Sequence, residues 1–562
     1  MNRWLLSNQL NIECLDSNNN LEKCNGYVRY MDLCRKFPKD CVDIVNADCS
    51  VFLDGYVSNK NELNKEYGYE KWEDTFSMIE TGQILSNLRG GFCGYRYNAG
   101  KNEFLLFTDH MGNKAVYYYM KDSNVILSNN INDIAKVLKE NHIAMEIDER
   151  AVLYMLTYGF MMDDTTFIKN VKRVMPGQYV RIVDDSVELV TYYQIDNTKT
   201  ESITEEQAVE KLDAAFRNAI RREFEKDREY GYRHLVDLSG GLDSRMVCMV
   251  AHDMGYTDQM NFTYCRPGYL DQKISEQIAA DLKHEYLFKS LDDIRWMYDI
   301  DEIVSKNNGA ALFSGITGGN RFLKSIDLST YGIEHTGMIG DAIVSTFYKD
   351  ESFNYSEPKW GYHRYSEKMK AEFDNSALTR YPNQEICAIY TRGILGAQSS
   401  YIIRQHYLET ASPFMDVDFL NVCFSLPFAY RKNHHIYLKW MKEKYPQACE
   451  YGWEKWGGVK PKENLIFFRR IVTGKKLLKN MLLKMFNRQS RDSMNPMDYW
   501  YRQDRDIQLY YKRYYEENIS NYVLTEQMRK DIQEMFETGN FLEMAMALTV
   551  LSAAKQYFGC KK

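Results

Sequence analysis

The segment SGGLDS (residues 239–244) combines two hydroxyl groups, two glycines and one carboxylate in six positions. Glycine lets a ligand approach the backbone without a Cβ in the way, and the N–H groups of such a turn bind anions when a helix begins behind them. The hydroxyls of Ser239 and Ser244 can donate to phosphate oxygens. Because Asp243 would repel a bare phosphate, we expect a divalent cation between them. A Gly-Gly turn without any ligand is the alternative, but it leaves these three polar side chains unexplained.

The surrounding pattern predicts where this loop lies. HLVDL (234–238) has the composition of a buried strand, and a helical pattern follows from Ser244. Short apolar runs then alternate with helical segments, which predicts a parallel sheet covered by helices on both faces. The loop would therefore lie at the carboxyl end of a strand, where such sheets bind ligands. It is not a Walker loop, because it lacks the Gly-Lys-Ser/Thr sequence.

Residues 1–195 have a different pattern, with short β-like runs such as 50–59 and 91–110. Alternating apolar residues on both sides of residues 98–100 predict a hairpin. Residues 71–88 interrupt these strands with a helical period. We therefore expect this part of the chain to be built mainly from antiparallel strands.

A polar, turn-rich segment at 196–204 separates the two patterns. The next helix is expected to begin with a capping box from Ser202 to Glu205. The length of the chain and this boundary predict three parts, residues 1–198, 199–465 and 466–562. The last part is expected to be helical and basic at its start.

Composition and charge exclude several classes of protein. With 71 Lys and Arg against 78 Asp and Glu, the formal net charge is −7, which argues against a dedicated nucleic-acid binder. The twelve cysteines include no Cys-x-x-Cys pair, so the common zinc and dithiol signatures are absent. We find no signal peptide and no run of about 18 apolar residues, so we expect a cytoplasmic protein without membrane insertion.

The SGGLDS loop resembles the pyrophosphate-binding loop (PP-loop) of the ATP pyrophosphatase superfamily, whose members cleave ATP between its α and β phosphates. Within that superfamily, segments in unbroken order resemble asparagine synthetases. These segments are FLDGYVSNKNEL (52–63), LRGGFCGYRY (88–97), TDHMGNKAVYY (108–118), ILSNNINDIAKVL (126–138), FIKNVKRVMPGQYVRI (167–182), TGMIGDA (336–342), ETASPFMD (409–416) and LPFAYRKNHHIYLKWMKEKYP (426–446). The resemblance implies an α/β chain with an N-terminal Ntn-type αββα β-sandwich, a doubly wound parallel-sheet PP-loop domain and a helical C-terminal extension.

The chain departs from this family near its start. Glutamine-hydrolysing members expose a cysteine directly after the initiator methionine, whereas this chain has Asn2, and its first cysteine is Cys14. A thiol inside the chain lacks the α-amino group that acts as the base in that chemistry. Cys14 is therefore expected to be a buried, small apolar residue. We expect a first domain without glutaminase activity, as in the similar β-lactam and lasso-peptide macrolactam synthetases.

The resemblance implies ATP and Mg²⁺ as cofactors and indicates the residues that bind them. Asp243 and Asp341 would hold Mg²⁺ across the pyrophosphate. The residues implied for ATP and pyrophosphate are Leu238, Ser239, Gly240, Gly241, Asp243, Ser244, Phe262, Thr263, Thr336 and Gly337. For Phe262, a plain core position is an equally open interpretation.

Two substitutions in the second loop remove polar groups that the acyl-transfer step would use. Met338 stands where the family has a polar residue, and Ala342 replaces the glutamate after Asp341. A thioether cannot relay a proton or orient an amine. Glu409 is the expected catalytic substitute, with a structural ion pair beside the core as the alternative.

Two basic residues complete the implied catalytic set. The segment 455–462 contains three lysines, of which Lys460 is expected to stabilise the pyrophosphate and the oxyanion, with a solvated surface position as the alternative. Arg245, on the first turn after the loop, is expected to direct its guanidinium at a phosphate or an acidic substrate. Its alternative is to extend to solvent.

These features predict an AMP- and pyrophosphate-forming ligase that adenylates a carboxylate and forms an amide. Its expected partners are ATP, a small molecule or peptide that carries the carboxylate, and an amine or ammonia; a homodimer is one expected assembly. An inactive binding or accessory protein remains an alternative, as does another PP-loop reaction such as nucleobase or tRNA modification. The sequence does not identify the acid or the amine.

Overall fold

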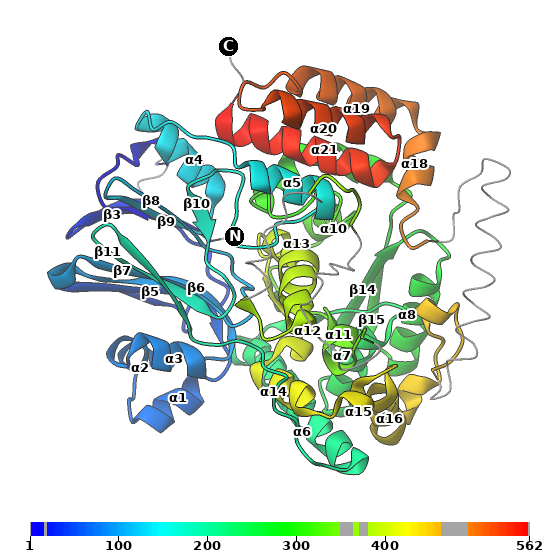
Figure 1. Cartoon of the computed structure of the whole chain (residues 1–562). Helices are drawn as coiled ribbons and strands as arrows, with labels where there is room; N and C mark the ends of the chain where they lie inside the picture. Colours follow the sequence, from blue (N-terminus) through cyan, green and yellow to red (C-terminus); the bar gives the residue numbers. More distant parts are fainter. Residues whose placement is uncertain (1, 16–19, 349–363, 370–379, 462–492, 560–562) are drawn as a thin grey trace.

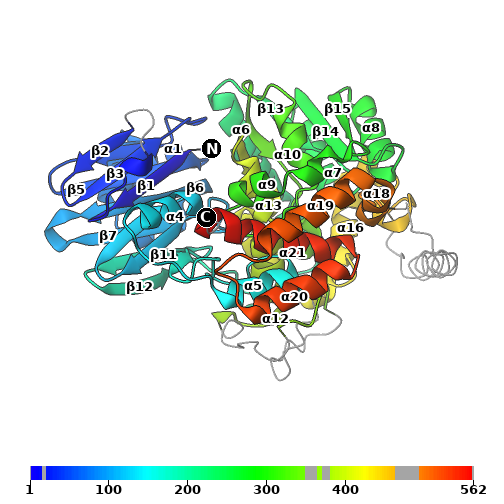
Figure 2. The ribbon, with the colours of Figure 1, turned by 90° about the horizontal axis from the view of Figure 1, so that it is seen from above.

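The computed structural model describes residues 2–15, 20–348, 364–369, 380–461 and 493–559. Figures 1 and 2 show two antiparallel sheets in the first part of the chain and a parallel sheet after it. Within these ranges, no helix combines the length and the apolar character that crossing a membrane requires. The expected basic start of the C-terminal part, 466–492, lies outside the described residues.

The first part of the chain contains the strands and helices of a layered sandwich. They are β1 (Arg3–Ser7), β2 (Leu21–Cys24), β3 (Tyr27–Asp32), β4 (Val42–Val45), β5 (Cys49–Val57), α1 (Lys60–Tyr67), α2 (Trp72–Met78), α3 (Thr81–Asn87), β6 (Gly90–Asn98), β7 (Glu103–Thr108), β8 (Tyr117–Lys121), β9 (Asn124–Ser128), α4 (Ile131–Glu140), α5 (Glu149–Tyr158), β10 (Val171–Arg173), β11 (Gln178–Val183) and β12 (Ser186–Thr191).

Two six-stranded sheets, with orders β10-β8-β9-β1-β3-β2 and β12-β11-β7-β6-β5-β4, pack face to face. Side chains from both, among them Trp4, Tyr95 and Leu106, fill the space between them. Helices α1–α3 cover the outer face of the second sheet, and α4 covers that of the first. These four layers form the αββα sandwich that the sequence predicts, because strands with two apolar faces need cover on both sides.

Three local predictions can be compared with the structure. The hairpin is confirmed, since β6 and β7 pair around a turn at Ala99–Lys101. The expected helix over 71–88 is instead two helices, because Ile79 is extended and Glu80 caps α3 by accepting from two backbone N–H groups. The capping box lies two residues later than predicted, where Thr204 and Gln207 bond each other's backbone.

The second part of the chain contains the parallel sheet and its helices. They are α6 (Glu205–Glu229), β13 (Arg233–Asp237), α7 (Leu242–Asp253), β14 (Gln259–Cys265), α8 (Leu270–Leu282), β15 (Glu285–Ser290), α9 (Ile300–Lys306), α10 (Gly319–Lys324), β16 (Tyr331–His335), α11 (Gly340–Val344), α12 (Gln384–Ala388), a π-helix (Ile389–Ala397), α13 (Ser399–Arg404), β17 (Glu409–Ala411), α14 (Val417–Ser425), α15 (Phe428–Arg431) and α16 (His435–Lys444).

The five strands lie in the order β15-β14-β13-β16-β17, and each pair of neighbours is parallel. Val236 packs towards α6, α7 and α8, whereas its neighbour Leu235 packs on the other face against α10. The sheet is therefore covered on both faces, as predicted. The chain builds outward from β13 to β15 and then returns to β16 on the other side of β13, so the strand order reverses between β13 and β16.

The described C-terminal helices are α18 (Met497–Gln503), α19 (Arg505–Asn518), α20 (Glu526–Glu537) and α21 (Phe541–Ala553). Helix α21 is apolar on nearly every side, and it packs against α5, α9 and α20 (Figure 1). A helix with this pattern has to be buried on all sides. The predicted helical extension is thus present in the described residues, where it covers the junction between the sandwich and the parallel sheet.

Candidate functional site

The loops that follow β13 and β16 meet at the point where the strand order reverses. They carry residues 239–244 and residues 336–341, and a pocket of about 380 Å³ lies beside them. All of the predicted nucleotide-binding residues except Gly240 line this pocket: Leu238, Ser239, Gly241, Asp243, Ser244, Phe262, Thr263, Thr336 and Gly337. The fold thus brings together residues that are about 100 positions apart, which is where ligands bind in such sheets.

The first loop is held by hydrogen bonds between its own hydroxyl groups. The hydroxyls of Ser239 and Ser244 lie 2.9 Å apart, and Ser244 Oγ also accepts from the backbone N–H of Ser239 at 3.0 Å. The N–H of Gly240 donates to Asp271 Oδ1 at 2.8 Å, which explains why Gly240 does not line the pocket. The two serines therefore hold the loop in shape while both remain at the pocket wall.

Glycines in the second loop allow it to touch the first. A Cβ at Gly337 would lie 2.3 Å from the backbone nitrogen of Ser244. A Cβ at Gly340 would lie 2.7 Å from Cγ of Asp243. Only glycine permits so close an approach, so these two positions set the distance between the loops.

Two carboxylates meet where the loops touch. Asp243 Oδ2 accepts from the backbone N–H of Asp341 at 2.9 Å, and Asp243 Oδ1 accepts from the Tyr437 hydroxyl at 2.8 Å. Burial and the nearby charge of Asp341 raise the pKa of Asp243 to about 7. Two carboxylates that oppose each other's ionisation are stabilised by a cation, and carboxylate oxygens are the ligands that Mg²⁺ prefers. The donor set therefore fits Mg²⁺.

The lysine at this site is Lys455, not Lys460. Lys455 Nζ lies 3.1 Å from Asp341 Oδ2. Lys460 instead pairs with Glu450 at 2.7 Å, with more than half of its side chain exposed at 54%. The structure thus places Lys455, and not the predicted Lys460, beside Asp341, because the turn at Gly457 and Gly458 reverses the chain between the two lysines.

Glu409 also lies elsewhere than expected. Its carboxylate is buried at the start of β17, where Oε1 accepts from Lys114 Nζ at 2.8 Å. The same ammonium lies 3.3 Å from Asp54 Oδ2. Glu409 contacts neither Asp243 nor the pocket described above, so the structure supports the alternative, an ion pair beside the core.

Arg245 is turned away from the pocket. Its side chain is fully buried and donates to the carbonyl oxygens of Ala448 at 2.9 Å and Tyr451 at 3.3 Å, and to those of Gly240 and Gly452. Burial lowers the pKa of Arg245 to about 10, so the guanidinium stays charged. The structure corrects both expectations for this residue: Arg245 fastens the first loop to the segment that precedes Lys455.

A second and larger pocket, of about 790 Å³, lies on the other side of the carboxylate pair. Asp341 and Lys455 line it, together with Ala342 and the π-helix residue Arg392. Met338 lines the first pocket instead. Lys455, Tyr437 and Arg392 were missed as site residues from the sequence. Lys455 lies in a segment that the sequence did single out, but no signal pointed to the other two.

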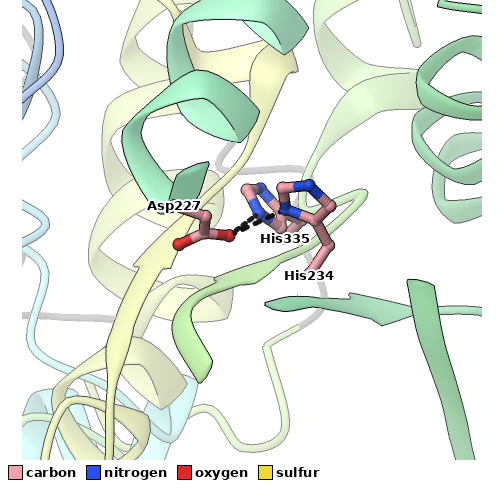
Figure 3. Close-up of side chains that lie close together, drawn as sticks. All are labelled: Asp227, His234 and His335. Atoms are coloured by element: carbon pink, nitrogen blue, oxygen red, sulfur yellow. Dashed lines mark hydrogen bonds and ion pairs between the residues drawn. The ribbon is translucent and has the colours of Figure 1, made fainter. Parts of the chain in front are cut away.

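A buried cluster outside both pockets joins α6 to the parallel sheet. Figure 3 shows the Asp227 carboxylate directed at the imidazoles of His234 and His335, and the three ligand atoms lie within 4.8 Å of one another. His335 Nε2 donates to Asp227 Oδ2 at 2.8 Å, and His234 Nδ1 donates to the same oxygen at 3.1 Å. Glu223 Oε2 lies 3.3 Å from His335 Nδ1. These contacts use every group, so the cluster is complete without an ion.

The protons in this cluster follow from the contacts. A neutral imidazole has one donor and one acceptor nitrogen, so His335 donates to Asp227 and accepts from a protonated Glu223. Burial raises the pKa of Glu223 to about 7 and that of Asp227 to about 6, and it lowers the pKa of His335. A protonated Glu223 satisfies these contacts without an additional buried charge.

Replacing Glu223 with glutamine is expected to flatten the pH dependence of stability. The pKa of Glu223 is about 7 in the folded protein against a usual value of 4.5, so its contribution is full below pH 4.5 and is lost as pH rises towards 7. Glutamine stays neutral, so the fall over that range should be shallower, by up to about 1.4 kcal/mol per pH unit. Urea unfolding at several pH values measures the free energy of unfolding and its slope against pH. The exposed Glu516→Gln is the control, and an unchanged slope in Glu223→Gln would contradict the assignment.

A further buried network lies in the sandwich, beside the start of β1 and the second half of β5. Asn2 donates from its side chain to Asp54, and its Oδ1 accepts from the backbone N–H of Cys34 at 2.6 Å. Asn129 donates to the backbone oxygen of Asn2 at 2.6 Å. Asp54 also accepts from Lys114 at 3.3 Å, so this carboxylate joins Asn2 to the lysine. A carboxamide at Asn2 offers no nucleophile.

Neither Cys93 nor Cys14 supplies a nucleophile in its place. Cys93 is buried, and desolvation raises its pKa well above the usual value, so it stays a thiol. Cys14 is exposed, contrary to the prediction that it is buried, because it lies in a short 3-10 helix at the surface. Neither residue has the activated thiolate that nucleophilic catalysis needs.

Comparison with known proteins agrees with the layered sandwich. Residues 49–193 match the glutamine amidotransferase domain. The chain is 25% identical over 270 residues to asparagine synthetase [glutamine-hydrolyzing] 1 of Bacillus subtilis (strain 168), which covers 45% of this chain and 41% of the relative. It is 23% identical over 213 residues to amidase chry2 of Gibberella zeae (strain ATCC MYA-4620 / CBS 123657 / FGSC 9075 / NRRL 31084 / PH-1), which covers 37% of this chain and 27% of the relative. The chain therefore spans less than half the length of each relative.

Two solved structures overlap with the chain at low similarity. One is a glutamine phosphoribosylpyrophosphate amidotransferase from B. subtilis complexed with ADP and GMP, with 9% identity, a TM-score of 0.26, and coverage of 52% of this chain and 91% of that one. The other is described as the allosteric regulatory enzyme of purine biosynthesis, with 9% identity, a TM-score of 0.24, and coverage of 51% and 74%.

The residues of the buried network belong to two different parts of the chain. Asp54, Cys93 and Lys114 lie within residues 49–193, the part of the chain that matches this domain model, whereas Glu409 belongs to the parallel sheet. The ammonium of Lys114 therefore joins the matched part of the chain to the sheet that carries the two loops.

Proposed function

We propose that this protein is an asparagine-synthetase-like ligase that uses ATP to adenylate a carboxylate and then forms an amide bond. The observation that carries the proposal is the meeting of Asp243, Asp341 and Lys455 between two pockets at the carboxyl ends of β13 and β16. The pocket of about 380 Å³ would take the nucleotide. The pocket of about 790 Å³ would take the acid.

The proposed reaction has two steps. A carboxylate oxygen of the acid bonds to the α-phosphorus of ATP, the bond from that phosphorus to the bridging oxygen breaks, and pyrophosphate leaves. The nitrogen of an amine or ammonia then bonds to the acyl carbon, the bond to AMP breaks, and the proton lost from nitrogen passes to a base or to water. Each step has a leaving group whose negative charge must be stabilised.

The residues of the site have separate roles in this proposal. The hydroxyls of Ser239 and Ser244 and the N–H groups at the start of α7 bind the phosphates. Asp243 and Asp341 would hold Mg²⁺, which lowers the charge repulsion between the carboxylate and the phosphates. Lys455 exchanges its partner Asp341 for the departing pyrophosphate. The acid is bound on the far side of this group, so its carboxylate faces the α-phosphorus.

Incorporation of labelled pyrophosphate into ATP tests the proposal. The protein is incubated with Mg²⁺, ATP and, in turn, amino acids, dicarboxylates and peptides with a free carboxylate. Exchange above the background without an acid is expected for at least one of them. No exchange with any acid, together with normal ATP binding, would contradict the ligase and would favour the inactive binding protein, to which Met338 and Ala342 point.

We further propose that the amine reaches the acid directly and is not released from glutamine. The buried network around Asn2, Asp54 and Lys114 supports this, because it has a hydrogen-bonded carboxamide and an ion pair where glutamine hydrolysis would need a nucleophile. The raised pKa of Cys93 supports it too. The amidotransferase domain would then act as a structural part of the ligase.

Glutamine is accordingly expected to yield no glutamate above background, with or without ATP and Mg²⁺. The physical reason is the absence of an activated thiolate beside a base at Asn2, Cys14 and Cys93. Glutamate release measured by coupled dehydrogenase assay checks this, with a glutamine-hydrolysing asparagine synthetase as the positive control. Turnover of glutamine at the rate of amide formation would overturn the prediction.

A further inference from the structure

The pocket of about 790 Å³ has both apolar and charged residues in its lining. Ile339 from the second loop, Ala388 from α12 and Ile389 from the π-helix form part of the wall. Asp341 and Lys455 lie at the end that faces the first pocket. A substrate in this pocket would have an apolar body, with its reacting carboxylate at that end.

Arg392 lines this pocket without a partner among the described residues. Among the residues that the structure describes, no hydrogen bond, ion pair or ring contact is recorded for its guanidinium, and its side chain is exposed. The other cations near the pocket do have partners: Lys455 pairs with Asp341 at 3.1 Å, and Arg431 pairs with Glu385 at 2.9 Å. An arginine presents a planar fork of donors that matches a carboxylate or a phosphate.

The backbone that carries Arg392 is unusual. It lies in a π-helix over Ile389–Ala397, a conformation that is found mostly as short insertions at functional sites. Glycines on this helix permit close contacts: a Cβ at Gly393 would lie 3.8 Å from Ile339, and one at Gly396 would lie 3.1 Å from Phe160. The π-helix is thus packed between the second loop and the end of α5.

Arg392 lies between two pockets. It lines the pocket of about 790 Å³ and also a pocket of about 230 Å³ between the end of α5 and α13, and Ala397 is shared by both. A molecule that enters the larger pocket with its carboxylate towards Asp341 therefore meets Arg392 along the wall. Because Lys455 would be engaged by pyrophosphate, the charge of Arg392 remains available for the acid.

We propose that Arg392 binds a second anionic group, a carboxylate or a phosphate, on the acid that this protein activates. The substrate class is then an acid with an apolar body and two anionic groups. The inference rests on the proposed function, because it assumes that the larger pocket receives the acid. Arg392 acts through binding and specificity and takes no part in bond breaking.

Binding of matched probes tests the proposal without requiring turnover. Glutarate, adipate and pimelate are compared with their monomethyl esters, and phosphonopropionate with propionate, by calorimetry in the presence of Mg²⁺ and α,β-methylene ATP. The best diacid or phosphonate is expected to bind wild type about tenfold more tightly than its singly charged partner. Comparison of the carboxylate and phosphonate arms identifies which anion is preferred.

Arg392→Ala is expected to remove this discrimination, and Arg392→Lys to retain part of it. Arg513→Ala, an exposed arginine on α19, is the matched control and should keep the full difference. Equal or undetectable binding of both members of every pair by wild type, or the same discrimination in Arg392→Ala, would overturn the proposal. Pyrophosphate exchange run in parallel reports separately on the ligase, so a protein that discriminates diacids without exchange would overturn only the proposed function.

Discussion

An Asp243→Asn variant is expected to lose pyrophosphate exchange by on the order of a thousandfold while its thermal stability stays equal or rises. The loss follows because an amide cannot replace a carboxylate as a ligand for Mg²⁺ opposite Asp341. The stability follows because Asp243 is buried and its ionisation is opposed by Asp341. A neutral amide removes that repulsion, and its oxygen can accept from the Asp341 N–H while its NH2 group donates to the Tyr437 hydroxyl oxygen.

The combination of lost activity with retained stability separates a ligand role from a folding role. Exchange and thermal melting are measured on the same preparation. Asp253→Asn, at the exposed C-terminal end of the same helix, is the control and should change neither. Asp341→Asn is expected to behave like Asp243→Asn. Exchange within threefold of wild type in either variant would be inconsistent with a shared metal site.

The second large effect is expected at Lys455. Lys455→Ala should lower exchange by about a hundredfold, because it removes the cation nearest to Asp341 and to the place of the departing pyrophosphate. Lys460→Ala should leave exchange unchanged, because its ammonium pairs with Glu450 at the surface. Both lysines lie in one short segment and both are partly exposed, which makes the pair a closely matched comparison.

Steady-state kinetics refine the interpretation of Lys455. If its charge acts on the leaving pyrophosphate, kcat should fall much more than the affinity for ATP, and Lys455→Arg should recover part of the rate. A large effect of Lys460→Ala combined with none for Lys455→Ala would reverse our assignment. Similar losses in both would indicate that the whole segment is needed for folding, and thermal melting would then show a matching decrease.

The sequence predicted the elements and the loops well for identifiable reasons. The strand before Ser239 is a short apolar run. The glycines and hydroxyls of the loop that follows it form a local signal that needs no tertiary information. The second loop is also local, since Gly337 and Asp341 are read from one short segment. The positions of these residues depend mainly on the local backbone conformation, which neighbouring residues determine, so the sequence was enough to predict them.

Three of the predicted catalytic residues lie away from the place where the sequence puts them, two of them for the same physical reason. Glu409 and Arg245 were judged by their position along the chain, but their partners come from distant segments, whereas Lys460 pairs with Glu450 only ten positions away. Arg245, for example, donates to carbonyl groups more than 200 positions away. The direction of a side chain on the first turn of a helix depends on which face the sheet covers, and one local motif does not contain that information.

Arg392 shows a further limit. A regular helix over its segment would place residues at intervals of about 3.6 per turn, so the exposed positions could be counted from the sequence. The π-helix at Ile389–Ala397 changes that interval and turns the following residues to a different face. No pattern in the sequence predicts such an insertion, so the position of Arg392 in the larger pocket could be found only from the structure.

The ammonium of Lys114 also makes the stability of the parallel sheet depend on the sandwich. Removing that ammonium while the sandwich stays in place would leave the Glu409 carboxylate buried without its counter-ion, and an uncompensated buried charge costs several kcal/mol, a large fraction of a typical folding free energy. A substitution in the sandwich, far from the two loops, can therefore lower the abundance of the whole chain in a cell without changing any residue of the site.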